Sequence, residues 1–196
     1  MAEDHGRETG CEVKRAALAL AALASLPAQA APPKPAQRLS IEQRLQRAED
    51  ELAIRRILID YHWTMDTRDF NGYAALFAKN GEWTSGNIHH YGPTDIHEMM
   101  VGIFGKQSEG SVQRRSIEIT TNPQIVIDGD HATARSRHLL IWRMADGHPE
   151  AVLAGRYEDD LIREDGKWKI LRRVDYPLMP SLAEWGVLAR KRSATQ

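Results

Sequence analysis

The sequence predicts an α+β fold in which one strongly curved antiparallel sheet wraps around helices. The first observation is that helical periodicity is confined to about Ser40–Gly105. The second is that three Asp-Gly pairs divide the chain that follows: Asp128-Gly129, Asp146-Gly147 and Asp165-Gly166. Asp-Gly between alternating runs is a strong hairpin signal, because such tight turns need positive φ at both central residues. We therefore expect a meander of four strands between Ser111 and Tyr176.

These strands exceed the usual length of roughly 5–6 residues, so the sheet is expected to curve and to contain β-bulges. A curved sheet needs a cover on its concave face, and the helical half of the chain is the candidate cover. The hollow between the two is where we expect chemistry. The strands are predicted at Ser111–Ile127, His131–Met144, Glu150–Arg163 and Lys167–Tyr176.

Length and composition narrow the class of protein. The 196 residues are enough for one domain with a hydrophobic core and too few to expect two. The net charge of −1 argues against a nucleic-acid partner. The single cysteine, Cys11, excludes an internal disulfide framework, and no spacing of histidines resembles a metal-ligand set. We therefore expect no metal and no organic cofactor.

The N-terminus has the pattern of a signal peptide covering residues 1–30. Lys14-Arg15 precede an apolar run of 11 residues, Ala16–Leu26, and Ala28-Gln29-Ala30 is a cleavage pattern. The run is too short to span a bilayer, which needs about 20 apolar residues. An exported protein, periplasmic or secreted, is expected, with no membrane association after processing. The alternative is an alanine-rich leader that is never cut.

A domain over residues 40–186 is predicted to follow a proline-rich tether at 31–39. Ser40 and Gln43 fit a capping box at the start of a helix that runs to about Met65. Its first part, residues 40–50, is either an extension that contacts a neighbouring subunit or a solvated amphipathic segment. A second helix is predicted from Asp69 to Lys79-Asn80-Gly81, short strands at Glu82–Ser85 and His89–Tyr91, and a third helix at Asp95–Phe104 capped by Thr94.

The chain after the last strand is predicted to close the pocket. Residues 177–186 are rich in apolar side chains that have no strand left to join: Leu178, Met179, Leu182 and Trp185. Residues 187–196 are predicted to be a disordered basic tail.

Five short motifs are spread over about Glu51–Tyr176. They are Tyr61-x4-Asp66-x2-Asp69-Phe70, Leu76-Phe77-x4-Glu82-Trp83, Thr121-Asn122-Pro123, Gly155-x-Tyr157-x-Asp159 and Asp165-Gly166-x-Trp168-x-Ile170. Together they resemble the SnoaL-like family of the nuclear transport factor 2-like superfamily. The resemblance implies a cone-shaped fold around an apolar pocket and a homo-oligomer, a dimer or a trimer, formed through the outer sheet face. The superfamily includes scytalone dehydratase, a hexachlorocyclohexane dehydrochlorinase, ketosteroid isomerase and binding modules without activity.

Side-chain alternation along a strand predicts which residues face the pocket. Arg135 and Arg137 mark the outer face of the second meander strand, which places His138 on the inner face. Tyr61 and Tyr157 are expected to donate hydrogen bonds to a substrate oxygen. The full predicted substrate-binding set is Tyr61, Tyr157, Trp83, Met99, Trp142, Trp168 and Trp185.

Asp66 is the first candidate catalytic residue. The resemblance implies that an aspartate at this position pairs with a histidine that removes a proton from carbon, but the matching position of that histidine is Glu118 here. Either His138 replaces the missing imidazole, or Glu118 is itself the base after burial raises its pKa. We expect Asp66 and His138 to form a hydrogen-bonded pair. The competing interpretations are a core histidine, a solvated glutamate and a local turn role for Asp66.

The sequence therefore predicts a cofactor-independent acid–base enzyme, a lyase of the dehydratase kind or an isomerase. The expected substrate is a small hydrophobic molecule, cyclic or aromatic. The alternative is a non-catalytic module of the same fold that binds a small ligand or serves in assembly.

Overall fold

The computed structural model describes residues 39–105 and 115–193. The predicted signal peptide, the tether up to Arg38, the start of the first predicted meander strand and the last three residues lie outside this part of the chain. The side chains of Ala189 and of residues 191–193 are also outside the description. No helix in the described ranges is both long enough and apolar enough to cross a membrane.

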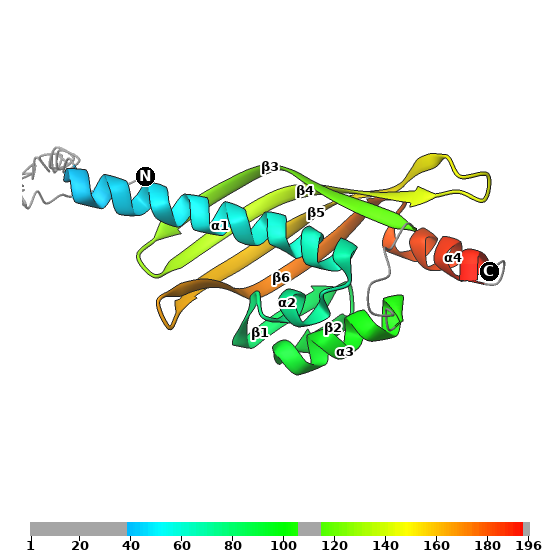
Figure 1. Ribbon diagram of the computed structural model, residues 1–196, viewed down its shortest axis with the longest axis horizontal. Coiled ribbons are helices and arrows are strands. Elements are labelled where there is room, and N and C mark those ends of the chain that lie inside the picture. Colours follow the sequence, from blue (N-terminus) through cyan, green and yellow to red (C-terminus); the bar gives the residue numbers. More distant parts are fainter. Residues whose placement is uncertain (1–38, 106–114, 194–196) are drawn as a thin grey trace, which may run out of the picture. The chain divides into compact units, whose positions relative to one another are not determined.

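The described chain is an α+β domain built on one curved six-stranded sheet with the strand order β2-β1-β6-β5-β4-β3 (Figure 1). Neighbouring strands are antiparallel, except that β1 runs parallel to β6. Helix α1 crosses one face of the sheet, and α2 and α3 lie beside the β1–β2 hairpin (Figure 1). The elements are α1 Ile41–Thr67, α2 Phe70–Ala74, β1 Phe77–Ser85, β2 Ile88–Tyr91, α3 Gly92–Phe104, β3 Ser116–Asp128, β4 His131–Arg143, β5 Pro149–Glu164, β6 Lys167–Met179 and α4 Leu182–Ser193.

The predicted capping box begins α1. The Ser40 side chain accepts the Gln43 N–H at 3.2 Å, and the Gln43 side chain accepts the Ser40 N–H at 2.9 Å. The buried residues lie on one side of the helix, at steps of one, three or four positions, and give it a mainly apolar face toward the sheet. They are Asp50, Ile54, Ile57, Leu58, Tyr61, His62 and Met65. The helix ends where Arg68 takes a left-handed conformation with φ 62°.

The prediction for the next two helices is partly wrong. Asp69 does cap α2, accepting the Gly72 N–H at 2.8 Å, but α2 ends at Ala74. Lys79-Asn80-Gly81, predicted to end this helix, lies inside β1. This segment forms a strand rather than the end of a helix because Phe77 is buried and pairs with Ile170 of β6. Helix α3 begins at Gly92, and Tyr91 rather than Thr94 is its N-cap residue.

The meander follows the prediction closely. On β4, buried and exposed residues alternate from His131 to His138, and Arg135 and Arg137 are exposed. The sheet also contains register shifts, among them one between Asp160 and Leu161 where β5 meets β6. Such shifts change which side chains face inward.

The C-terminal segment differs from the prediction in two ways. Leu178 and Met179, which were expected to have no strand to join, belong to β6, and α4 continues to Ser193. Two of its side chains contact the domain. The Trp185 ring lies 5.0 Å from the ring of Trp142 on β4, and Leu182 lies so close to Gly86 that a Cβ there would be 2.5 Å from it. The prediction that residues 187–196 are disordered is therefore wrong as far as Ser193.

Candidate active site

The Glu118 carboxylate is the centre of a buried charged cluster between α1 and the sheet. Its side chain is only 8% exposed, and its Oε1 lies 2.8 Å from Nδ1 of His138. The Tyr157 hydroxyl donates to Oε1 at 3.0 Å, and Oε2 lies 3.7 Å from Nδ1 of His62. Burial would raise the pKa of Glu118, but the two histidines outweigh it and hold the pKa far below its usual value.

His138 lies between two carboxylates. Its Nε2 is 3.1 Å from Oδ1 of Asp175, and its Nδ1 faces Glu118 at an angle outside hydrogen-bond geometry, so that contact is an ion pair. The ring stacks on Tyr157 with 4.2 Å between centroids. Burial lowers the pKa of His138, but Asp175 and Glu118 outweigh burial and raise the pKa to about 9. His138 is therefore an imidazolium at neutral pH.

Gly155 makes room for this ring. It is the register partner of His138 on β5. A Cβ on Gly155 would lie 2.2 Å from Nε2 of His138 and 2.8 Å from the carbonyl oxygen of Tyr176. Any side chain at Gly155 would therefore displace the His138 ring from Asp175.

Asp66 borders the cluster from the last turn of α1. Its Oδ2 accepts the backbone N–H of Glu118 at 3.3 Å. Burial is the largest cause that raises the pKa of Asp66 to about 6, and the negative charge of Glu118 adds to it. The Glu118 N–H, His62 and Arg68 act in the opposite direction but do not cancel the effect. Asp66 is therefore ionised at neutral pH and titrates just below it.

The predicted hydrogen bond between Asp66 and His138 is not formed. Both ring nitrogens of His138 face other carboxylates, those of Glu118 and Asp175. The reason is that Glu118 projects inward from β3, next to His138 on β4. The two candidates that the sequence offered as alternatives, His138 and Glu118, therefore belong to one cluster, and Asp66 is connected to it through the Glu118 backbone.

Sequence reasoning missed Asp175 entirely. The alternation that places Trp168 and Ile170 inside would place Asp175 outside. The register shift between Asp160 and Leu161 reverses this, so that Arg173 is buried and Asp175 reaches His138. The Ser85 hydroxyl of β1 donates to Asp175 at 3.3 Å. No signal in the sequence marks this bulge.

His62 is the other histidine of the cluster and was not among the predicted site residues. It is 4% exposed, and neither ring nitrogen has a hydrogen-bond partner among the described residues. Its position one turn before Asp66 is the sequence signal that could have identified it.

The two predicted hydrogen-bond donors already have protein partners. The Tyr157 hydroxyl donates to Glu118, and the Tyr61 hydroxyl accepts the indole N–H of Trp83 at 2.9 Å. Burial raises the pKa of Tyr61 to about 12. The Arg173 guanidinium lies 3.8 Å from the centre of the Tyr61 ring and pairs with Asp159 at 2.6 Å. Tyr61 and Tyr157 are thus held rigidly at the cluster.

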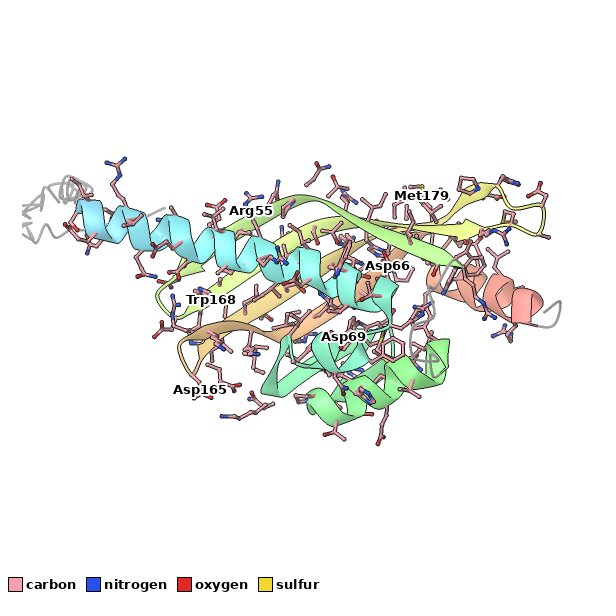
Figure 2. All side chains as sticks on the ribbon, in the orientation of Figure 1. Arg55, Asp66, Asp69, Asp165, Trp168 and Met179 are labelled. Carbon is pink, nitrogen blue, oxygen red and sulfur yellow. The ribbon has the colours of Figure 1, made fainter. Side chains whose placement is uncertain are left out.

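Trp168 lies too far away to share a small pocket with Asp66. Its indole N–H donates to Asp50 at 3.0 Å, which anchors the other end of α1. Asp50 precedes Asp66 by 16 residues, about 24 Å along a helix at 1.5 Å per residue. Figure 2 shows Trp168 toward one end of the sheet and Asp66 near the middle of its length. Met99 is buried in the core, and Trp142 and Trp185 contact each other.

Metal ligation finds no support among the described side chains, because no group of three or more His, Cys, Asp or Glu residues is placed to hold an ion. His89 and His90 contact different acids, Glu82 at 2.8 Å and Asp95 at 3.0 Å.

Comparisons with known proteins agree with the fold. The model of the SnoaL-like domain matches residues 46–174. No curated protein sequence matches the chain. Among solved structures, a protein of unknown function from Mycobacterium tuberculosis is 25% identical with a TM-score of 0.61, and the match covers 68% of this chain and 75% of that one.

Two further solved structures have names that refer to an activity. A scytalone dehydratase-like protein from Novosphingobium aromaticivorans is 26% identical with a TM-score of 0.57, and the match covers 68% of this chain and 87% of that one. A hexachlorocyclohexane dehydrochlorinase of type 2 is 19% identical with a TM-score of 0.58, and the match covers 68% and 88%. At 19% identity the second likeness concerns the fold alone.

Proposed function

Because the chain belongs to the SnoaL-like domain family, we propose that it is a cofactor-independent acid–base enzyme, a lyase of the dehydratase kind or an isomerase. The proposed substrate is a small hydrophobic molecule, cyclic or aromatic. The observation that carries the proposal is Asp66, a half-buried carboxylate with its pKa raised to about 6 beside a buried charged cluster. A general base works best when its pKa lies near the operating pH.

The pKa values favour Asp66 as the base over the two residues first considered. His138 carries a proton at neutral pH, because its pKa is about 9, so it has no lone pair to accept another. Glu118 is a weak base, since His62 and His138 hold its pKa far below the usual value. In this proposal, His138, Glu118 and Asp175 fix the local charge, and the Glu118 N–H positions the Asp66 carboxylate.

The proposed reaction begins when Asp66 takes a proton from a carbon next to an electron-withdrawing group. The C–H electron pair then forms a double bond. In an elimination, the leaving group departs from the neighbouring carbon, and Asp66 later releases its proton to solvent. In an isomerisation, Asp66 returns the proton to a different carbon. A carboxylic acid with a pKa of about 6 can take part in both halves of such a cycle.

A second candidate function is a ligand-binding module without chemistry. It is favoured by the occupied donors, because the Tyr157 hydroxyl donates to Glu118 and His138 lies between two carboxylates. In that case the cluster would only hold α1 against the sheet, and Asp66 would contact a bound molecule without exchanging protons.

The test begins with the molecule that accompanies the protein. The full chain is purified from its native source and denatured, and any released small molecule is identified by mass spectrometry. That molecule is then incubated with fresh protein in D2O. We expect exchange of a carbon-bound hydrogen for deuterium, or loss of a leaving group such as water. Binding without either change would favour the second candidate.

The matched variants are Asp66→Asn and Asp60→Asn. Asp60 lies on the same helix and pairs with Arg56 at 2.8 Å. Asp66→Asn should reduce the rate by ~10² or more, the usual scale for loss of a general base, and Asp60→Asn should retain it. When the wild-type rate is plotted against pH, it should decrease on the acidic side with a midpoint near pH 6, the pKa of Asp66. Full activity of Asp66→Asn would refute the assignment.

A further inference from the structure

Helix α1 has a continuous apolar stripe on the side opposite its buried face. We call it the α1 outer stripe: Ile41, Leu45, Leu52, Ile59 and Trp63. Each of these side chains is between 58% and 77% exposed. At 3.6 residues per turn they fall within one narrow sector, directly across the helix from Ile54 and Met65. Exposed single hydrophobic residues are ordinary, but a row of five along one helix indicates a contact surface.

The first turns of α1 also extend without cover from the domain. All side chains from Ile41 to Glu49 are exposed, although the capping box and the helix are well formed. In Figure 1 this end of α1 projects past the strands. Short helices without a packing partner are marginal in water. Both the stripe and this extension are therefore surfaces that a partner would stabilise.

The stripe has the spacing of a coiled-coil seam. Leu45, Leu52 and Ile59 are seven residues apart, and Ile41 and Ala48 fall at the intermediate positions. Alternating steps of four and three residues are the heptad pattern of two helices that pack along their length. Between Leu52 and Ile59 the same spacing places Arg55 in the seam, and the Glu51 carboxylate binds the Arg55 guanidinium at 2.7 Å. One polar seam residue fixes register at some loss of stability.

The charges beside the seam are complementary to a second copy of the same helix. In a parallel pair, consider the residue directly before Leu45 or Leu52 on one helix. It lies beside the residue of the partner helix whose number is higher by five. This places Arg44 against Glu49 and Glu51 against Arg56, and both pairs have opposite charge. We propose that the α1 outer stripe is a self-association surface, on which two copies of the chain pair through parallel α1 helices.

The chain's own N-terminal segment is a poorer occupant. Its apolar run, Ala16–Leu26, has 11 residues and would reach about 16 Å even as a continuous helix. The stripe from Ile41 to Trp63 is about 33 Å long by the same measure. A second α1 covers it completely, and both domains then lie on the outer sides of the helix pair.

Sedimentation equilibrium of the full chain tests this inference. We expect a dimer at tens of micromolar, and Leu52→Glu should weaken its dissociation constant by at least about 10-fold. Two controls have comparable exposed apolar side chains: Ile103→Glu on α3, 61% exposed, and Val126→Glu on the outer sheet face, 63% exposed. Both should leave the dimer intact. A monomeric wild type would overturn the proposal, as would a dimer that Val126→Glu disrupts and Leu52→Glu does not.

A charge exchange tests the parallel orientation. Arg44→Glu alone and Glu49→Arg alone should each weaken the dimer, since each places like charges side by side. The double variant should restore dimerisation to near the wild-type level. An antiparallel pair would instead leave the double variant weaker than either single one, and that result would overturn the parallel arrangement. Circular dichroism on each variant checks that the fold is retained.

Discussion

Removing the imidazole of His138 should be strongly destabilising, because its charge lies between two buried or nearly buried carboxylates. His138→Gln keeps a polar side chain of similar size but leaves Glu118 and Asp175 without their shared cation. Breaking a buried ion pair by removing one partner costs about 3–5 kcal/mol. We expect a loss of that order in the free energy of unfolding at pH 6, measured by guanidinium denaturation.

The same substitution should remove a specific pH dependence. The pKa of His138 is raised from 6.5 to about 9 in the folded protein. The stabilisation is therefore complete below about pH 6.5 and is lost as the pH rises toward about 9, since the unfolded chain releases the proton first. The shift of about 2.5 units corresponds to about 3 kcal/mol at 1.36 kcal/mol per unit.

The informative quantity is the stability of the wild type minus that of the variant across this pH range, because it cancels the titration of other groups. The matched control is His131→Gln, a histidine that is exposed on the same strand. We expect the difference to shrink by about 3 kcal/mol for His138→Gln and to stay flat for His131→Gln. A flat difference for His138→Gln would show that the two carboxylates do not hold its proton.

Three further predictions concern other parts of the chain. Gly155→Ala should cost about 1–3 kcal/mol by overpacking and should lower the pKa of His138 in an NMR titration, because the new Cβ displaces the ring from Asp175. An unchanged pKa would contradict the account of Gly155. If residues 1–30 are a signal peptide, intact-mass measurement of the exported protein should show a chain that begins at Ala31, whereas retention of Met1 would exclude cleavage. Ending the chain after Pro180 removes the Trp142–Trp185 contact and should weaken binding of the co-purified molecule more than it lowers the melting temperature. Unchanged binding with a lower melting temperature would assign residues 181–193 a structural role only.

Local chemistry made most of the sheet predictable. Both central residues have positive φ only in the Asp165-Gly166 turn, at 52° and 76°, whereas at the other two pairs the glycine alone does, Gly129 at 59° and Gly147 at 94°. The exposed Arg135 and Arg137 identified the outer face of β4, which was enough to place His138 inside. These features depend on neighbouring residues of one strand, and such information is present in a single sequence.

Contacts between distant segments were harder to predict. Asn80-Gly81 is a good helix-ending signal, yet pairing of Phe77 with Ile170 makes this segment a strand. Asp175 faces the site only because β6 is shifted against β5, and no local pattern reports that shift. The partner of His138 was predicted wrongly for a related reason, since the position of Glu118 between Asp66 and His138 depends on how α1 crosses β3 and β4.

The position of Glu118 also gives a physical reason why Asp66, rather than a histidine, is the base in the proposed mechanism. The family resemblance implies a histidine at this position, paired with an aspartate that matches Asp66. A buried carboxylate in its place needs a cation, and His138 supplies it while also facing Asp175. Burial raises the pKa of Asp66, and the negative charge of Glu118 adds to this effect, against the opposing Glu118 N–H, His62 and Arg68. The replacement of an imidazole by Glu118 thus favours Asp66 itself, rather than a histidine that it orients, as the group that takes the proton.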